Sequence, residues 1–279
     1  MLFVVLTAAR PSGRALPTHE PDPSRGEMLY RAGGCISCHK GTDAVGITGP
    51  PTGEAPFETP VGTFWPGNLT PEPETGLGGW TAEQFVDAMT RGVSPDGRHY
   101  FPAFPYPSYR IMPVEDLLDL WAYLQSLEPV RSQPRAPDIP QLGLARRGVG
   151  LWKRLAPGGE EFRPDPERNA TWNRGAYLVH GPGHCGECHT PRNALMISDQ
   201  SRAMAGGPHP RGKGMVPSLL DMDGRGRYSD VSDLVLALQF GETFGYDKLS
   251  SGGMADVQMN LATLPEADLR AIAEYLLSL

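Results

Sequence analysis

The chain has 279 residues, of which 39% are hydrophobic and 20% are charged, so it can build packed cores and is not disordered by composition. Its formal net charge of −7 lacks the basic footprint of a nucleic-acid binder, and we expect no nucleic acid among its partners. The 34 glycines and 29 prolines predict small domains with long loops. At roughly 150 residues per domain, the length suggests two domains.

The chain opens with a short apolar run over residues 1–9, with no basic residue before it. A secretory signal has a charged start and a longer apolar stretch. We therefore expect residues 1–20 to be a disordered tail or the remnant of an export signal. No other stretch approaches the ~18 apolar residues of a membrane helix, so no transmembrane span is expected.

Three helical patterns follow in the first half. Residues 26–32 predict a helix that ends directly before the sequence CISCH at residues 35–39. The other two patterns are "GWTAEQFVDAMTRG" over residues 79–92 and "MPVEDLLDLWAYLQSL" over residues 112–127. Pro113 stands at the expected first helical position and is followed by acidic residues, which suit a helix N-terminus.

Residues 131–173 form a connector between the halves. Within it, "LGLARRGVGLWKRL" over residues 142–155 has the pattern of a basic amphipathic helix. We expect this helix to pack against one domain through Leu142, Val149, Leu151 and Trp152. Binding to a membrane or to a partner is the alternative.

The second half repeats the three blocks in the same order. "RGAYLVHGPGHCGECHT" matches "RGEMLYRAGGCISCHK", and the segments "RYSDVSDLVLALQFG" and "LPEADLRAIAEYLLSL" match the other two helices. Ser229 or Asp230 is expected to cap one helix, and Pro265 to begin the last. Since no segment shows convincing strand alternation, the duplication predicts an all-α fold. It has one domain over residues 21–130 and another over residues 174–279.

All four cysteines lie in the repeat, as two C-x-x-C-H sequences 150 residues apart. A structural zinc site needs four ligands, whereas each copy offers half a site. A thioredoxin-type dithiol needs a βαβ pattern that the sequence lacks. C-x-x-C-H is the attachment signal of c-type haem, because two thiols one helical turn apart suit its two vinyl groups. The motifs predict two covalently bound haems c, anchored by Cys35, Cys38, Cys185 and Cys188, with His39 and His189 as iron ligands.

The second axial ligand separates two classes of function. A methionine raises the potential of the iron and leaves no open site, which suits electron transfer, whereas an open site suits catalysis. In the second half, Met254 stands in a Gly-rich loop before the last helix and is the expected ligand. Met259 and then Met222 are the alternatives.

In the first half, the position that matches Met254 in the repeat falls near Phe104, whose side chain cannot bind iron. We expect Met112, which stands just before the third helix, to bind the first iron. Met89, His99, another ligand or an open site are the alternatives.

Further expectations concern the surroundings of the two irons. The outer ring nitrogens of His39 and His189 are expected to bind backbone carbonyls near Pro50 or Pro51 and near Pro191. Arg192 is a candidate contact for a haem propionate, or a surface arginine without a role. The other histidines are expected to be exposed or locally bonded. The tryptophans are expected to pack against haem edges and at helix contacts: Trp65, Trp80, Trp121, Trp152 and Trp172.

Longer strings resemble a known family. "GNLTPEPETGLGGWT", "DGRHYFPAFPYPSY" and "EFRPDPERNATWNRGAYLVHGPGHCGECHTPRNAL" are similar to the cytochrome c subunits of membrane-associated bacterial alcohol, gluconate and fructose dehydrogenases, and to related dihaem cytochromes c. The resemblance covers roughly residues 21–279. Many members have methionine where this chain has Phe104, and the family often keeps a methionine at the place of Met112.

The resemblance implies two tandem class I-like cytochrome c domains in the periplasm. They would accept electrons from a partner dehydrogenase and pass them to a cytochrome, a quinone-linked complex or an oxidase. Those subunits usually carry three haems and a C-terminal membrane anchor, whereas two haems and no anchor are expected here. A haem enzyme of oxidase or peroxidase-like type, with an open first haem, is the alternative.

Overall fold

The computed structural model describes residues 7–9, 12–13, 15–156, 158–211, 214–222, 228, 230–243, 247–248 and 253–279. Contacts divide the chain into two units. Unit 1 comprises Met1–Leu29, Cys38–Asp43 and Pro50–Glu161, and unit 2 comprises Tyr30–Ser37, Ala44–Gly49 and Phe162–Leu279. The division passes through the first C-x-x-C-H sequence, between Ser37 and Cys38.

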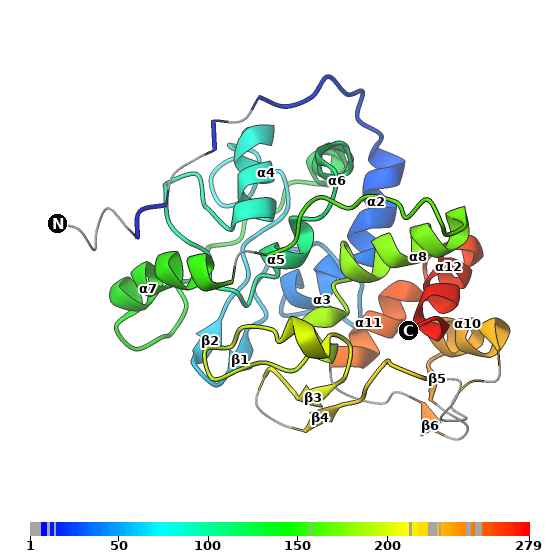
Figure 1. Ribbon diagram of the computed structural model, residues 1–279. Helices are drawn as coiled ribbons and strands as arrows, with labels where there is room; N and C mark the ends of the chain where they lie inside the picture. The colour runs from blue at the N-terminus through cyan, green and yellow to red at the C-terminus, as the bar shows by residue number, and fades with distance from the viewer. Residues whose placement is uncertain are drawn as a thin grey trace. The chain divides into compact units, whose positions relative to one another are not determined.

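Helices dominate the described residues (Figure 1). In the first half they are α2 (Pro23–Ala32), α3 (Cys35–His39), α4 (Ala82–Arg91), α5 (Tyr106–Tyr109), α6 (Val114–Ser126) and α7 (Leu142–Leu155). The second half has α8 (Ala170–His180), α9 (Gly186–His189), the short 3-10 helix η1 (Gln200–Arg202), α10 (Val231–Phe240), α11 (Gly253–Leu261) and α12 (Glu266–Leu277). The predicted helical class is confirmed, and none of the helices in the described part of the chain has the length and apolar character needed to cross a bilayer.

In the part of the chain that the structure describes, three short antiparallel ladders interrupt the helices. They pair β1 (Phe57–Thr59) with β2 (Gly62–Phe64), β3 (Gly207–Pro208) with β4 (Met215–Val216), and β5 (Glu242–Thr243) with β6 (Asp247–Lys248). Each strand has two or three residues, which is too short for an alternating pattern to be visible in the sequence.

Helix α4 in the first copy and its counterpart α10 in the second copy start and end in the same way. Thr81 caps α4 in a capping box with Gln84, and the Asp230 carboxylate accepts two backbone N–H groups at the start of α10. Gly92 and Gly241 end the two helices in the left-handed conformation, with φ of 59° and 72°. Asp230 is one of the two predicted caps, and the other, Ser229, lies outside the described residues.

The two prolines that were expected at the first helical position stand one residue before it. Pro113 and Pro265 are the N-caps of α6 and α12, with ψ of 145° and 142°. An N-cap residue has an extended backbone, and the fixed φ of proline fits that position as well as the first helical one.

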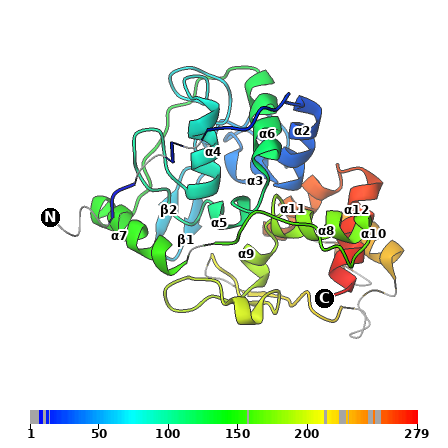
Figure 2. The ribbon, with the colours of Figure 1, turned by 45° about the horizontal axis from the view of Figure 1, so that its top comes forward.

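The first and last helices of each copy meet at a glycine. In unit 1, α2 lies beside α6 (Figures 1 and 2), and a Cβ added to Gly26 would lie 2.0 Å from the carbonyl oxygen of Asp119. In unit 2, α8 packs on α12, and a Cβ added to Gly175 would lie 1.9 Å from the carbonyl oxygen of Ala271. The backbones approach so closely that only glycine fits at either position.

An ion pair stands next to each of these glycines. Arg25 pairs with Asp116 on α6, and Arg174 makes two hydrogen bonds of 2.8 and 3.0 Å to the carboxylate of Asp268 on α12. Arg25 and Arg174 occupy the same position of the repeat. The duplicated sequence therefore builds the same helix pair twice.

Part of the N-terminal segment packs on unit 1. Thr7 is buried, the Ser12 N–H donates to Asp87 Oδ2 over 2.8 Å, and His19 Nε2 donates to Asp119 Oδ1 over 2.6 Å. A disordered tail is therefore not what the structure shows for these three residues.

Candidate haem-binding sites

Each C-x-x-C-H sequence forms one short helical turn, within α3 and at α9. The residue before each turn is left-handed in both copies, with φ of 55° at Gly34 and 39° at His184. Glycine adopts this conformation at no steric cost, whereas histidine is strained there, so the second copy carries strain that the first avoids. None of the four cysteines is paired in a disulfide, so all four are available to anchor haem.

The imidazole that follows each turn is fixed by a backbone carbonyl. Nδ1 of His39 lies 2.6 Å from the oxygen of Gly67, and Nδ1 of His189 lies 2.8 Å from the oxygen of Pro217. The acceptor is 28 residues further along the chain in both cases. Since a carbonyl only accepts, Nδ1 carries the hydrogen and Nε2 keeps its lone pair. Within the described part of the chain, no hydrogen bond occupies Nε2 of either ring.

The prediction of a carbonyl acceptor is confirmed, but the predicted positions are wrong. The carbonyl of Pro50 accepts from the N–H of Thr52, that of Pro51 from Leu69, and that of Pro191 from Asp199. These carbonyls stabilise the loops that follow the motifs. The histidine rings bind instead to carbonyls further along each loop, those of Gly67 and Pro217.

Both histidines are neutral at pH 7. Burial lowers the pKa of His39 to about 4 and also lowers the pKa of His189, and the carbonyl hydrogen bond opposes this shift only in part. Neutral imidazole is the form that binds a metal.

Two buried N–H groups have no acceptor among the described residues: Nε1 of Trp65 and Nε of Arg192. Buried donors are nearly always paired, so each needs an acceptor from outside this part of the chain. Trp65 stands two residues before Gly67, and Arg192 stands three residues after His189. A haem carries two propionate carboxylates, and one beside each histidine would satisfy these donors. The residues present therefore fit a haem at each motif.

The predicted methionines differ in their surroundings. Met112 precedes α6 and is 2% exposed, whereas Met254 is 38% exposed. Met254, expected in a loop, is the second residue of α11, because the helix starts at Gly253 and has Asp256 in its first turn. Met259 lies on the same helix, and Met222 is buried. Met89 lies on the buried face of α4, as its helical spacing predicts.

His99 is buried and bonded to residues distant in sequence, contrary to the exposed or locally bonded position expected for it. Its Nδ1 accepts from Lys153 Nζ over 3.1 Å, and its Nε2 donates to the carbonyl of Thr7 over 3.1 Å. Neither ring nitrogen is available to an iron in this arrangement.

Known proteins match this chain over most of its length. Residues 23–128 match the family model described as cytochrome c. Over 260 residues, the chain is 41% identical to a diheme cytochrome c-type protein of Cereibacter sphaeroides, and the match covers 91% of this chain and 85% of that protein. The chain belongs to the dihaem cytochrome c family. The prediction of two covalently bound haems c is thereby confirmed.

Other relatives of this dihaem cytochrome are longer. This chain is 36% identical over 290 residues to the fructose dehydrogenase cytochrome subunit of Gluconobacter japonicus, and the match covers 99% of this chain and 58% of that protein. It is 37% identical over 267 residues to the gluconate 2-dehydrogenase cytochrome c subunit of Pantoea cypripedii, covering 91% of this chain and 59% of that protein. The cytochrome thus spans little more than half the length of these two relatives.

Arg192 of the cytochrome is engaged mainly within its own turn. Its Nη2 donates to the Glu187 carboxylate over 2.5 Å and to the Glu187 carbonyl over 2.9 Å, and its Nη1 donates to the Met196 carbonyl over 2.9 Å. Arg192 therefore holds the loop after the second motif against α9. Three of the five guanidinium N–H donors are used in this way, and the buried Nε–H is the one without an acceptor that could make the predicted propionate contact.

Sequence reasoning missed the two carbonyl residues and the indole donor. A signal for the carbonyls exists in the repeat, since Gly67 and Pro217 stand at the same distance from their histidines and each is followed two residues later by leucine. No signal marks the indole of Trp65, because an unpaired donor is visible only once the side chain is placed.

Proposed function

We propose that this dihaem cytochrome relays single electrons in the periplasm from a partner dehydrogenase to a cytochrome, a quinone-linked complex or an oxidase. The observation that carries the proposal is the pair of neutral histidines, each with Nδ1 bound to a carbonyl 28 residues away and Nε2 left for iron. The names of the relatives support a dehydrogenase as donor.

The proposed ligand sets follow the repeat. In a domain over residues 21–130, Cys35 and Cys38 would anchor the first haem, and His39 and Met112 would bind its iron. In a domain over residues 174–279, Cys185, Cys188, His189 and Met254 would do the same for the second. A haem bound in this way gains and loses one electron without any bond to a substrate.

The protein's own residues prepare each site for that exchange. The carbonyls of Gly67 and Pro217 fix the ring orientation and tautomer, so little rearrangement accompanies a change of iron charge. Met112 is buried, and a buried thioether on the iron would keep water from the first site, which suits electron transfer rather than catalysis.

A potentiometric titration of the wild type beside Met112→Ala and Met254→Ala tests the ligands. Each substitution is expected to lower the potential of one haem strongly and to leave the other unchanged, because methionine ligation raises the potential. Met215→Ala is the matched control, since Met215 is highly exposed. A substitution that leaves both potentials unchanged would show that its ligand assignment is wrong.

The ferric spectrum of the wild type separates electron transfer from catalysis. Two low-spin haems with methionine-type near-infrared bands are expected. A high-spin component, or rapid cyanide binding at one haem, would contradict the proposal and favour an oxidase or peroxidase-like enzyme.

A further inference from the structure

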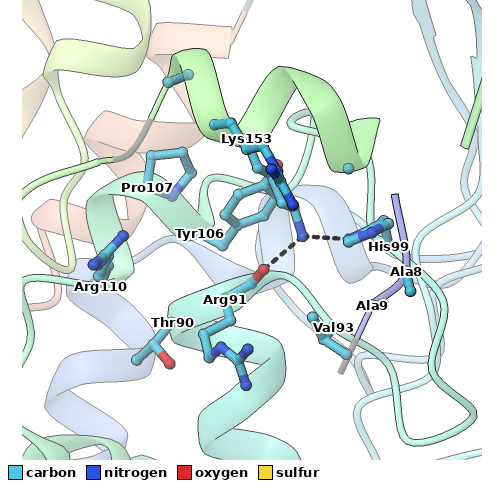
Figure 3. Close-up of a pocket in the computed structure, with 13 residues that line it drawn as sticks. Ala8, Ala9, Thr90, Arg91, Val93, His99, Tyr106, Pro107, Arg110 and Lys153 are labelled. Atoms are coloured by element: carbon cyan, nitrogen blue, oxygen red, sulfur yellow. Dashed lines mark hydrogen bonds between the residues drawn. The ribbon is translucent and has the colours of Figure 1, made fainter. Parts of the chain in front are cut away.

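Helix α7 is fixed on unit 1 by one of its faces. Figure 3 shows Lys153 reaching from α7 toward His99 and the end of α4, where Nζ donates to the carbonyls of Arg91 and Gly92 over 2.5 and 2.7 Å. The last carbonyls of a helix lack partners within it, so the ammonium satisfies them. Val149 and Gly150 are buried on the same face. These contacts determine which side of α7 faces outward.

The outward side carries an exposed apolar stripe. Leu144, Leu151 and Leu155 are 59%, 48% and 58% exposed, and their spacing of seven and four residues places them on one helix face. The predicted packing of Leu151 against a domain is therefore wrong. Leaving three leucines in water on one helix is unfavourable unless another apolar phase covers them.

Basic residues flank the stripe. Arg147 and Arg154 are exposed, and α7 contains four basic residues and no acidic one. Over residues 130–159 there are six basic residues and one acidic residue, a net charge of +5 in a chain whose net charge is −7. A cavity of ≈ 480 Å³ beside Lys153 is lined by further basic side chains and, among the described residues, by no acidic one. The segment that carries the stripe, and the cavity beside Lys153, are therefore positive.

The composition of α7 distinguishes a lipid surface from a protein partner. The helix contains no Ser, Thr, Asn, Gln, Asp or Glu, so its exposed side offers apolar and cationic side chains, the two kinds of group that an anionic bilayer binds. Leucines on one face and arginines beside them are the pattern of a helix that lies in the plane of a membrane interface. The nearest acidic residues in sequence, Asp138 and Glu160, stand beyond its two ends.

We propose that α7 lies on the surface of an anionic lipid bilayer, with Leu144, Leu151 and Leu155 among the acyl chains and Arg147 and Arg154 at the headgroups. Long basic side chains keep their charge at the headgroup level while their stems lie along apolar surface. Both ribbon views place α7 at the edge of unit 1, and residues 7–9 lie beside it (Figures 1 and 2). The proposal does not depend on the electron donor or acceptor.

Co-sedimentation of the full-length holoprotein with vesicles tests this proposal. The wild type is expected to bind vesicles of phosphatidylcholine mixed with phosphatidylglycerol more tightly than vesicles of pure phosphatidylcholine. Its binding to the mixed vesicles is expected to weaken at high salt. The triple variant Leu144→Gln/Leu151→Gln/Leu155→Gln is expected to bind about tenfold less or weaker still. Arg147→Gln/Arg154→Gln is expected to lose the preference for the anionic lipid.

A matched control replaces exposed apolar residues elsewhere: Leu195→Gln/Leu236→Gln/Phe240→Gln. This variant is expected to bind like the wild type, and the haem spectrum of every variant reports that it is folded. A wild type that ignores anionic vesicles overturns the proposal. If the leucine variant then slows reduction by a partner dehydrogenase, the stripe docks a protein instead.

Two further outcomes also overturn the proposal. One is a leucine variant that binds anionic vesicles as tightly as the wild type. The other is binding that survives in the leucine variant but disappears when residues 2–6 are deleted, which would assign the lipid contact to the apolar start of the chain.

Discussion

At the scale of single residues, a backbone carbonyl decides which nitrogen of each proposed iron-binding histidine faces the metal. Because the acceptors at Gly67 and Pro217 are main-chain atoms, a side-chain substitution does not remove them. The orientation of each ring is therefore a property of the loop. Adjustment of the haem potential would fall to side chains that contact the cofactor, and Trp65, whose buried N–H has no acceptor among the described residues, is the proposed example.

Trp65→Phe is expected to lower the potential of one haem and to leave the other unchanged. The indole N–H would offset part of a propionate's negative charge, and that charge favours the oxidised iron. A hydrogen bond contributes about 0.5–1.5 kcal/mol, so the shift is up to about 60 mV for one electron. Potentiometry measures it. Trp172→Phe is the control, because Nε1 of Trp172 already donates to Ser278 Oγ over 2.7 Å, and an equal shift there would refute the propionate contact.

His99 makes unit 1 less stable in acid. Burial and the nearby Lys153 lower its pKa below 6.5, so the unfolded chain binds a proton more readily than the folded one. Its contribution to stability is present above pH 6.5 and is lost as the pH falls toward the folded-state pKa. One proton changes the free energy of unfolding by at most about 1.4 kcal/mol per pH unit.

His99→Gln is expected to flatten this part of the pH profile while leaving an acceptor for Lys153. Denaturant unfolding between the neutral range and mild acid measures the slope. An unchanged slope in the variant would mean that another group carries the acid sensitivity.

The sequence predicts the cysteines and histidines of the two sites, because C-x-x-C-H is local and its spacing determines its chemistry. It does not predict the carbonyls, since every residue has one and the fold alone chooses between them. It also places His99 wrongly, because the burial of that ring depends on Lys153 and Thr7, which are distant in sequence.

At the scale of helices, the paired glycines set how closely the first and last helices approach. Gly175→Ala is expected to destabilise unit 2 by at least about 2 kcal/mol, because the new Cβ would lie 1.9 Å from a backbone oxygen that has no room to move. Gly26→Ala is expected to have the same effect on unit 1. Denaturant unfolding followed by circular dichroism measures both.

Gly148→Ala is the matched control within a helix. A Cβ there would meet nothing within 4 Å, and alanine is about 0.5–1 kcal/mol more favourable than glycine in a helix. The variant is expected to be neutral or slightly more stable. Equal losses at Gly148 and Gly175 would contradict the close-approach argument.

Apolar periodicity locates α4, α6, α7, α10 and α12, because each buries one face. The starts of α6 and α12 differ from prediction by one residue, since proline fits both the cap and the first turn. The start of α11 was not predicted, because its first residues, Gly253 and Met254, resemble a loop in composition. The face of α7 could not be assigned either, since Leu151 and Val149 are equally apolar and only contacts separate them.

At the scale of the whole molecule, the duplication implies that each motif holds its own haem. The variant Cys185→Ala/Cys188→Ala is expected to retain one haem per chain, and the variant Cys35→Ala/Cys38→Ala likewise. The pyridine haemochrome absorbance per chain should fall by half in each. A variant that keeps both haems, or loses both, would contradict separate sites.

Averages over the whole chain conceal local features. The net charge of −7 argues against nucleic acid, yet it does not show the positive segment around α7. The repeat predicts two helical halves, but it does not predict that residues 30–37 and 44–49 group with the second half by contact. Such grouping depends on packing between segments that the repeat does not relate.

The carbonyl bond to each histidine also has a consequence for the order of assembly. The cysteines and histidine of a motif lie within five residues, so cofactor attachment needs only local chain. The bond from histidine to carbonyl closes a loop of 28 residues, whose entropy cost is about 3 kcal/mol. During unfolding this bond is lost while the thioethers persist. Each refolding chain therefore starts with its cofactor already attached. It has to form again only the slower loop contact, in which the histidine finds its carbonyl.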